Sequence, residues 1–234
     1  MQIRKLALFL SSLFVAGAAL ADITVGVSVS ATGPAASLGI PEKNTFALLP
    51  QTIAGEKVKW VVLDDASDPT AAVKNVRKMI GEDKADVLIG SSLTPASMAV
   101  LEVAAESKMA QIAMAPMPPA GDKTRWLFIT PQNFGLMGAA LAEHMAANGV
   151  KTIGFIGYAD SYGEIWLKAM QGVAEAKGIR IVATERYQRA DTSVAGQAIK
   201  LLAANPDAVF VAGSGTPAVL PQATLVERGY KGRI

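Results

Sequence analysis

The sequence predicts an α/β protein with mainly parallel sheets in two lobes, and three observations support this. Short apolar runs alternate with amphipathic segments along the chain, which is the pattern of strand–helix units in a parallel sheet. A proline-rich stretch, residues 115–122, interrupts the alternation, because its prolines exclude both a helix and an interior strand. A second series of strand–helix units follows. We therefore place the division between the lobes between about Pro119 and Asn133.

The first 21 residues are typical of a secretory signal peptide. Arg4 and Lys5 supply its positive end, and Ala19-Leu20-Ala21 has the small-x-small pattern of a cleavage site. Two serines interrupt the apolar stretch between them, which is therefore shorter than the roughly 20 residues of a membrane-spanning helix. We expect export with cleavage between Ala21 and Asp22.

The composition narrows the class of protein. The chain has no cysteine, which excludes a disulfide, a thiolate metal site and a lipid-modified cysteine after the signal. An exported protein of this kind is expected to be free in a Gram-negative periplasm. The mature chain is close to neutral once Arg4 and Lys5 are removed, and it shows no nucleic-acid or membrane-surface footprint. We expect a monomer with no nucleic-acid partner.

The expected strands are short apolar runs, and the expected helices lie between them. The runs are Ile23–Ser30, Val58–Asp64, Val87–Ser91, Ala110–Ala115, Trp126–Thr130, Thr152–Tyr158, Ile179–Ala183 and Ala208–Ala212. The expected division is a first lobe over residues 22–120, a crossover or hinge region over 121–132 and a second lobe over 133–234. One helix is expected after Asp68-Pro69, an N-cap followed by a first-position proline. Another is expected from Asn133 to Asn148, ending at Gly149.

Two loops share a pattern that suits an anionic ligand. Residues 90–96 and residues 213–218 each follow a strand with a Gly-Ser turn and a Thr-Pro step. We expect Thr94 to cap the next helix, whose free N–H groups attract an anion at the carboxyl end of the sheet. The alternative is that both loops are only helix caps. Pro221 indicates that the second helix starts later than Thr216.

Two more loops follow strands. Ser161 and Glu164 match a capping box, and Tyr162 between them lies where a phenol can stack on a ligand or hydrogen-bond to it. The Ser30–Gly39 loop is rich in small residues, which allow the backbone to approach a ligand closely.

Enzymatic alternatives find little support in the residues. A hydrolase triad would depend on His144, the single histidine, and no nucleophile-elbow motif supplies its serine. Glu143-His144 lacks the second histidine of a zinc helix, and we expect no metal site. Asp64 and Asp65 could indicate acid–base chemistry, but their position after a strand favours loop hydrogen bonds. No glycine-rich nucleotide signature follows the first strand. We expect neither a catalytic residue nor a cofactor.

Several short motifs occur in an order that covers nearly the whole mature chain. They are Thr32-Gly33-Pro34, Asp64-Asp65-Ala66 with Asp68-Pro69, the Gly90–Thr94 loop, and Tyr162-Gly163-Glu164. With them the chain resembles a type I periplasmic solute-binding protein of ABC importers, of the leucine/isoleucine/valine-binding family. The resemblance implies two Rossmann-like lobes joined by crossovers, which close on a small solute in a hinged cleft. It also implies a non-catalytic receptor for a branched-chain amino acid or similar carboxylate, with an importer permease as partner.

The resemblance also implies a set of ligand-binding residues. Thr94 takes the place of a hydroxyl that binds the solute carboxylate, Ala115 offers a backbone group, and Tyr162 resembles the tyrosine of the second lobe. The full set implied is Leu38, Ser92, Thr94, Ala115, Pro116, Met117, Tyr162, Ser214, Gly215 and Thr216.

Two features depart from the family pattern. Met117 stands where the family has another Ser or Thr, so the carboxylate site keeps a backbone donor but lacks a hydroxyl. Together with the small loop Gly213–Gly215, Met117 leaves room for an aromatic ring. Ile234 falls where another strand should start, and the acidic residue that binds an amino group in relatives would follow it, so the resemblance implies an incomplete second lobe. Two alternatives stay open: a binder of aromatic or other small organic acids for the same kind of importer, and a ligand-sensing receptor module.

Overall fold

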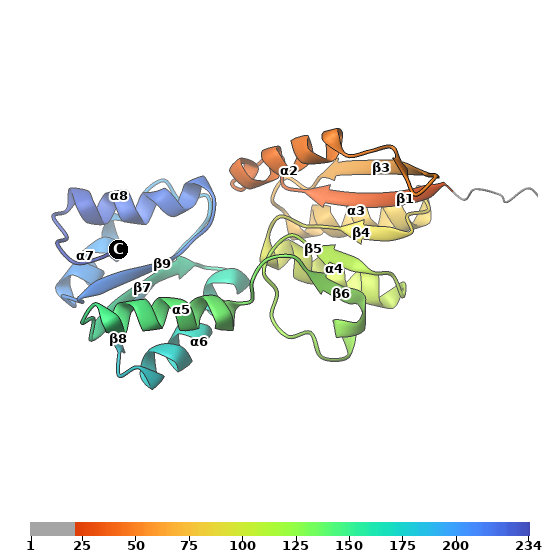
Figure 1. The fold of residues 1–234 in the computed structure, drawn as a ribbon. Coiled ribbons are helices and arrows are strands. Elements are labelled where there is room, and N and C mark those ends of the chain that lie inside the picture. Colours follow the sequence, from red (N-terminus) through yellow and green to blue (C-terminus); the bar gives the residue numbers. More distant parts are fainter. Residues whose placement is uncertain (1–21) are drawn as a thin grey trace, which may run out of the picture.

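The computed structural model describes residues 22–234, and two separate β-sheets form two lobes (Figure 1). The predicted signal peptide and its cleavage site lie outside the described residues, except for Asp22. Within residues 22–234, no helix combines the length and the apolar character needed to cross a membrane. The prediction of an α/β fold with two lobes is confirmed.

The first sheet has the order β2-β3-β1-β4-β5-β6. Its strands are β1 (Ile23–Val29), β2 (Thr52–Ile53), β3 (Glu56–Asp64), β4 (Val87–Ile89), β5 (Gln111–Ala113) and β6 (Leu127–Ile129). All neighbours are parallel except β2, which pairs antiparallel with β3. The two-residue β2 has no apolar run behind it and was not predicted. Because β6 pairs with β5, the first sheet includes a strand from the segment expected to be a crossover.

Helices cover both faces of this sheet. Helix α2 (Ala36–Leu48) packs Phe46 against one face, together with Val25, Val27, Val29 and Val58. Helices α3 (Pro69–Gly81) and α4 (Thr94–Glu106) pack on the other face around Met79, Leu88 and Val100. A short 3₁₀ helix, η1 (Gly121–Trp126), precedes β6. Strand β1 is almost wholly buried because helices cover both its faces, which explains its continuous apolar sequence.

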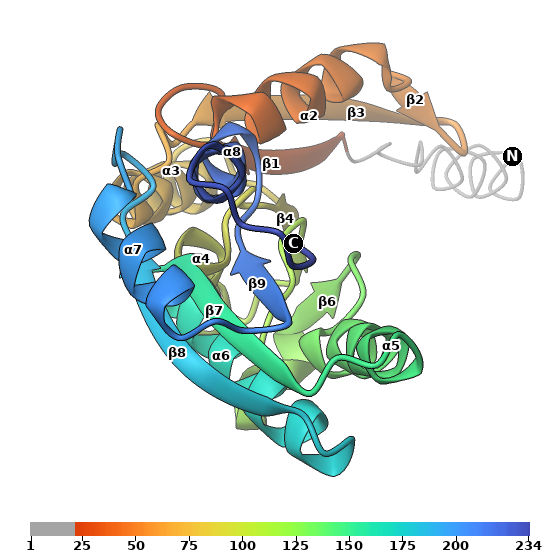
Figure 2. The same ribbon diagram turned by 90° about the vertical axis from the view of Figure 1, so that its left-hand side faces the viewer.

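The second sheet has the order β8-β7-β9 and is entirely parallel. Its strands are β7 (Thr152–Tyr158), β8 (Arg180–Tyr187) and β9 (Ala208–Ala212). Helices α5 (Phe134–Ala147) and α6 (Ser161–Ala176) pack on one face, and α7 (Ala195–Ala203) and α8 (Val219–Glu227) on the other. Figure 2, turned from Figure 1, shows α7 and α8 on the side of the sheet opposite α5. A 3₁₀ turn, η2 (Thr216–Ala218), precedes α8, so the helix starts after Thr216, as Pro221 indicated.

The helix ends test the predicted caps. Asp68 accepts a hydrogen bond from the backbone N–H of Ala71 at 2.7 Å, and Asn133 accepts one from Leu136 at 2.8 Å. Gly149 follows α5 with φ of 76°, a left-handed conformation that glycine adopts without strain. The predictions for Asp68 and Gly149 are confirmed, and Asn133, expected as the first residue of a helix, is the N-cap of α5.

The predicted capping box at the start of α6 is wrong. Asp160, one residue before the expected Ser161, is the N-cap: its carboxylate accepts from the N–H groups of Tyr162 at 2.9 Å and Gly163 at 3.3 Å. Glu164 pairs instead with Arg186 on β8. The aspartate displaces the serine because its charged oxygen is the stronger acceptor for helix N–H groups.

Candidate functional site

The candidate site is built around the topological switch points of the two sheets. In the first sheet, β1 and β4 are neighbours, and the chain moves outward from them in opposite directions. In the second sheet, β7 and β9 are related in the same way. Ligands of open α/β sheets bind outside the carboxyl ends of strands at such points. The loops after these four strands contain seven of the ten predicted ligand-binding residues, Leu38 at the start of α2 included.

A buried carboxylate holds the first-lobe loops in place. Asp65, which is fully buried, accepts hydrogen bonds from the hydroxyls of Ser28 at 2.9 Å, Ser30 at 2.7 Å and Ser91 at 2.6 Å. These serines belong to β1 and to the loops after β1 and β4. The prediction that Asp65 makes loop hydrogen bonds is confirmed, and the network fixes the geometry of the first switch point.

The start of α4 differs from the prediction. Thr94 is the first helical residue, Leu93 takes the N-cap position, and no side chain caps the helix. The prediction that Thr94 is the cap is therefore wrong. Its buried hydroxyl instead donates to the carbonyl of Pro116 at 2.8 Å, which ties α4 to the segment after β5.

The start of α4 has backbone hydrogen-bond donors without a protein acceptor. Among residues 22–234, no protein group accepts from the N–H groups of Thr94 and Ala96, and Pro95 between them has no N–H. Helices α3, α5 and α6 each have a side-chain cap, whereas α2, α7 and α8, like α4, have none. Free N–H groups at the positive end of a helix dipole suit an anion.

The hydroxyl of Ser92, one of the predicted ligand-binding residues, is already hydrogen-bonded within the first lobe. Its hydroxyl donates to the carboxylate of Glu42 on α2 and accepts from the N–H of Ser30 at 2.9 Å. Burial raises the pKa of Glu42 above its ordinary value, and the hydrogen bond from Ser92 opposes that rise. Glu42 was not singled out in the sequence.

The segment after β5 contains the other first-lobe candidates. Ala115 and Met117 are each 3% exposed, and Pro116 between them is half-buried. The Met117 side chain packs with Leu101, Ala113 and Leu127. Met117 thus contributes to the core of the first lobe, whereas from the sequence we expected it only to offer a backbone donor and to leave room for an aromatic ring.

Aromatic residues dominate the second-lobe side. The hydroxyl of Tyr158, the last residue of β7, donates to the carbonyl of Ser214 at 2.6 Å and accepts from its N–H at 3.2 Å. Tyr162 is half-buried, and its ring lies 5.8 Å from that of Phe134 and 6.1 Å from that of Tyr158, between centroids. The loop after β9 is therefore fixed to β7.

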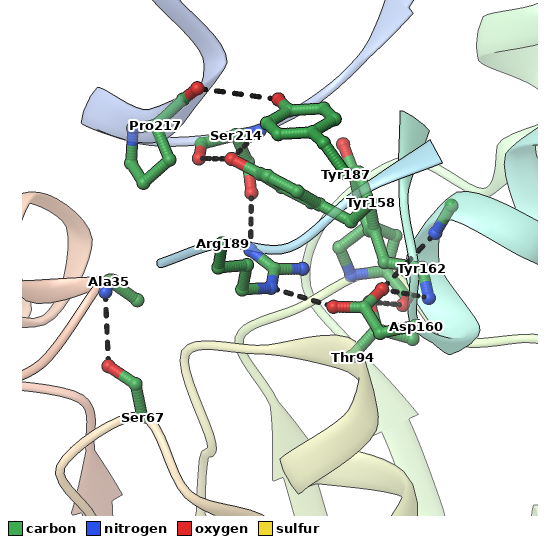
Figure 3. A network of polar contacts seen from close by, with 12 residues as sticks. Ala35, Ser67, Thr94, Tyr158, Asp160, Tyr162, Tyr187, Arg189, Ser214 and Pro217 are labelled. Carbon is green, nitrogen blue, oxygen red and sulfur yellow. Dashed lines mark hydrogen bonds and ion pairs between the residues drawn. The ribbon is translucent and has the colours of Figure 1, made fainter. Parts of the chain in front are cut away.

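A charged cluster that the sequence did not reveal lies among these rings (Figure 3). Arg189, two residues beyond β8, donates through Nε to the carboxylate of Asp160 at 2.7 Å. Its guanidinium carbon lies 3.8 Å from the centre of the Tyr158 ring and 5.6 Å from that of Tyr162. Its Nη1 is 3.5 Å from the hydroxyl of Ser214, at the limit of a hydrogen bond. No local sequence motif marks Arg189, because its partners come from other strand ends.

The two lobes touch at predicted residues. The N–H of Thr216 donates to the hydroxyl of Ser37 on α2 at 3.0 Å. A side chain at Gly215, whose φ is 66°, would place its Cβ 2.8 Å from that hydroxyl and 3.4 Å from Cγ of Leu38. Glycine is thus required at this contact by both conformation and space. The structure brings Leu38 together with Gly215 and Thr216 across the lobe boundary.

A separate cavity of about 750 Å³ lies where the segment after β5 meets α5 and α6. Its lining is mainly apolar, with Phe134 and Ile165 on the second-lobe side and Lys168 as its charged residue. Of the predicted set it includes Met117 alone. Because it contains neither the start of α4 nor the loop after β9, we place the candidate site at the switch points, not in this cavity.

The N–H groups of Thr94 and Ala96 at the start of α4 are the part of this arrangement that suits an anion. His144 is exposed on α5, where its ring lies 3.4 Å from the side-chain amide of Asn148. Among the described residues, no group of three or more histidine, aspartate or glutamate side chains lies in a metal-binding arrangement.

Comparisons with known proteins agree with this architecture. A family model described as periplasmic binding protein matches residues 22–234. An extracellular ligand-binding receptor of known structure from Rhodopseudomonas palustris is 53% identical, with a TM-score of 0.88 over 90% of this chain and 59% of the receptor. The Leu/Ile/Val-binding protein homolog 3 of Brucella melitensis is 26% identical over 216 residues, which are 88% of this chain and 58% of that protein.

One more solved structure has a known ligand. A solute binding protein of an ABC transporter from R. palustris BisB5, in complex with 3,4-dihydroxy benzoic acid, is 25% identical, with a TM-score of 0.82 over 91% of this chain and 60% of that chain. The chain thus spans about three-fifths of the length of these relatives. The resemblance seen in the sequence is confirmed, and the family consists of binding proteins, not enzymes. The chain belongs to the periplasmic binding protein family.

Proposed function

We propose that this chain is the solute-binding component of an ABC importer and that it binds a small carboxylate between its two lobes. The start of α4 is the observation that carries the proposal, because it offers the N–H groups of Thr94 and Ala96 without a cap at a switch point. The assignment to an importer is supported by the relative from R. palustris BisB5, which is described as a solute binding protein of an ABC transporter. The proposal includes a periplasmic location and a membrane permease as partner.

In this proposal each lobe holds one side of the solute. The solute carboxylate accepts hydrogen bonds from the start of α4, next to Ser92 and the segment Ala115–Met117. Tyr162 and the loop Ser214–Thr216 contact the solute from the second lobe, and Leu38 contributes apolar surface from α2. The link between β6 and α5, residues 130–133, is where a hinge would act, because it joins the two sheets.

Two classes of solute follow from the relatives. The Leu/Ile/Val-binding homologue points to a branched-chain amino acid. The relative with 3,4-dihydroxy benzoic acid points to an aromatic acid, and the half-buried ring of Tyr162 beside the candidate site favours a planar solute. The experiment must therefore include both classes.

The test is a thermal-shift screen of the purified full chain against amino acids, aromatic acids and aliphatic acids. A solute at about 100 times its Kd adds about 2.7 kcal/mol to the free energy of unfolding, a clear shift in melting temperature. The proposed function fails if no carboxylate stabilises the protein.

A substitution then tests the place of binding. Thr94→Ala removes the bond to Pro116 that positions the start of α4, so we expect about fivefold weaker carboxylate binding, from about 1 kcal/mol. The matched control is Thr224→Ala on α8, which removes a hydroxyl bond of equal length, 2.8 Å, to the carbonyl of Leu220. Equal affinity of Thr94→Ala and the parent would move the solute away from α4.

A further inference from the structure

Arg189 has a hydrogen-bonding capacity that its surroundings do not use. Its side chain is 12% exposed, and its Nη2 is buried with no hydrogen-bond partner among the described residues. A buried charged donor without an acceptor is costly, since burial removes the water that would otherwise bind it. An unpaired guanidinium nitrogen at a switch point of the sheet is therefore a candidate ligand contact.

The neighbours of Arg189 hold it in place but leave this donor unused. The carboxylate of Asp160 already accepts from Nε and from the two N–H groups at the start of α6. The ring of Tyr158 covers one face of the guanidinium, and Ser214, reached by Nη1, is itself bonded to Tyr158. Figure 3 shows the guanidinium between Asp160 and Ser214, on the side of the second lobe that faces Thr94. The orientation is fixed before any solute arrives.

The chemistry of this group selects for acceptors. A guanidinium has donors and no acceptor, so it binds a carboxylate, carbonyl or phenol oxygen. An ammonium group, like the guanidinium, has donors but no acceptor and carries a positive charge, so it gains nothing from Arg189. Asp160 does not offer it an acceptor either, because its oxygens are engaged by Arg189 and by the start of α6.

We propose that Arg189 is the specificity-determining residue of the second lobe: its free Nη2–H donates to an oxygen of the bound solute, and it selects small organic acids without an ammonium group over amino acids. The proposal rests on the proposed function, because it requires a solute between the lobes. It decides between the two solute classes in favour of organic acids.

Two matched ligand pairs test the parent protein by isothermal titration calorimetry. Leucine and 4-methylpentanoate differ by the ammonium group alone, and 4-hydroxybenzoate and benzoate differ by one hydroxyl. We expect at least tenfold tighter binding of 4-methylpentanoate than of leucine, and tighter binding of 4-hydroxybenzoate than of benzoate. Preference for leucine, or binding of none of the four by a protein that binds another carboxylate in the screen, overturns the proposal.

Arg189→Gln then tests the residue itself. We expect it to weaken binding of 4-hydroxybenzoate by about tenfold to a hundredfold and to reduce the preference for 4-methylpentanoate over leucine. Arg189→Lys, which keeps the charge but lacks the planar fork, should retain part of both. Arg186→Gln is the control, since Arg186 also pairs with the first turn of α6 but is 44% exposed; it should leave all four affinities unchanged.

The outcomes separate the two proposals. If no carboxylate stabilises the parent protein, the proposed function fails. If carboxylates bind but Arg189→Gln, shown to be folded by its circular dichroism, keeps both ligand ratios of the parent, the role of Arg189 alone is refuted. If Arg189→Gln does not fold, the ligand ratios of the parent and of Arg189→Lys decide.

Discussion

Removing the charge of Asp160 should destabilise the protein through Arg189 and not through the helix cap. Asparagine caps helices as well as aspartate does, so Asp160→Asn keeps the N–H bonds at the start of α6 while it leaves the guanidinium of Arg189 without its counter-ion. The side chains of this pair are 22% and 12% exposed, intermediate between a surface pair and a fully buried one.

The magnitude follows from this partial burial. Breaking a fully buried pair costs about 3 to 5 kcal/mol, whereas exposed pairs contribute about 0 to 1 kcal/mol. For Asp160 and Arg189 we expect a coupling free energy of about 2 kcal/mol. The double variant Asp160→Asn/Arg189→Gln should therefore lose about 2 kcal/mol less than the sum of its single variants.

The assay is urea unfolding followed by circular dichroism, with the four proteins of a double-mutant cycle. The nearby pair of Glu164 on α6 and Arg186 on β8 is 51% and 44% exposed, so its coupling should stay below about 1 kcal/mol. Equal coupling in the two pairs, or less than about 0.5 kcal/mol for Asp160 with Arg189, would refute the reasoning that burial makes this pair strong.

Three further outcomes are expected. Gly163→Ala would place a Cβ 1.9 Å from the carbonyl oxygen of Tyr158 and should lower the urea midpoint strongly. In the control Gly172→Ala, on the same helix, the Cβ meets nothing within 4 Å, so this variant should raise the midpoint. Similar midpoints for the two variants would contradict the close packing of Gly163 against Tyr158. Gly215→Ala would force a left-handed alanine against a first-lobe serine, so small-angle scattering should report a larger radius of gyration, and an unchanged radius would count against the lobe contact. Burial raises the pKa of Glu42 in the folded state. As the pH rises from about 4.5 through that raised pKa, the unfolded chain releases a proton that the folded chain keeps, so the parent protein should lose stability relative to Glu42→Gln. A pH-independent difference in urea midpoint between the two proteins would show that this carboxyl titrates normally.

The sequence predicted the scaffold well where local signals agree. Strands β7 and β9 have the predicted bounds, because each is an apolar run buried by helices on both faces. Strand β8 is longer than predicted, since it lies at the edge of its sheet and its residues Thr184–Arg186 are polar. Edge strands need fewer apolar residues, so hydropathy alone cannot define their ends.

The sequence predicted where the loops of the candidate site lie, but not the hydrogen bonds and ion pairs that those loops make. The switch-point loops follow from strand order, and the four loops expected to approach a ligand do lie at the carboxyl ends of strands. The cap at Leu93 and the pairing of Arg189 with Asp160 could not be read from the sequence, because both depend on which of several polar groups meets which acceptor in three dimensions. Only the folded chain resolves that competition.

The loop after β9 contacts both Arg189, the proposed solute contact, and the first lobe. Ser214 is bonded through its backbone to Tyr158 and reached by Arg189, while Thr216, two residues later, donates to Ser37 of the first lobe. Gly215 between them has a backbone conformation that glycine adopts without strain, so the loop turns from one contact directly to the other. In the proposed binding mode, a solute oxygen bound to Arg189 would act on the loop that touches α2, and solutes that satisfy Arg189 would favour the state in which the lobes are together. If Arg189 contacts the solute as proposed, selection for acceptor groups and contact between the lobes both depend on the segment Ser214–Thr216.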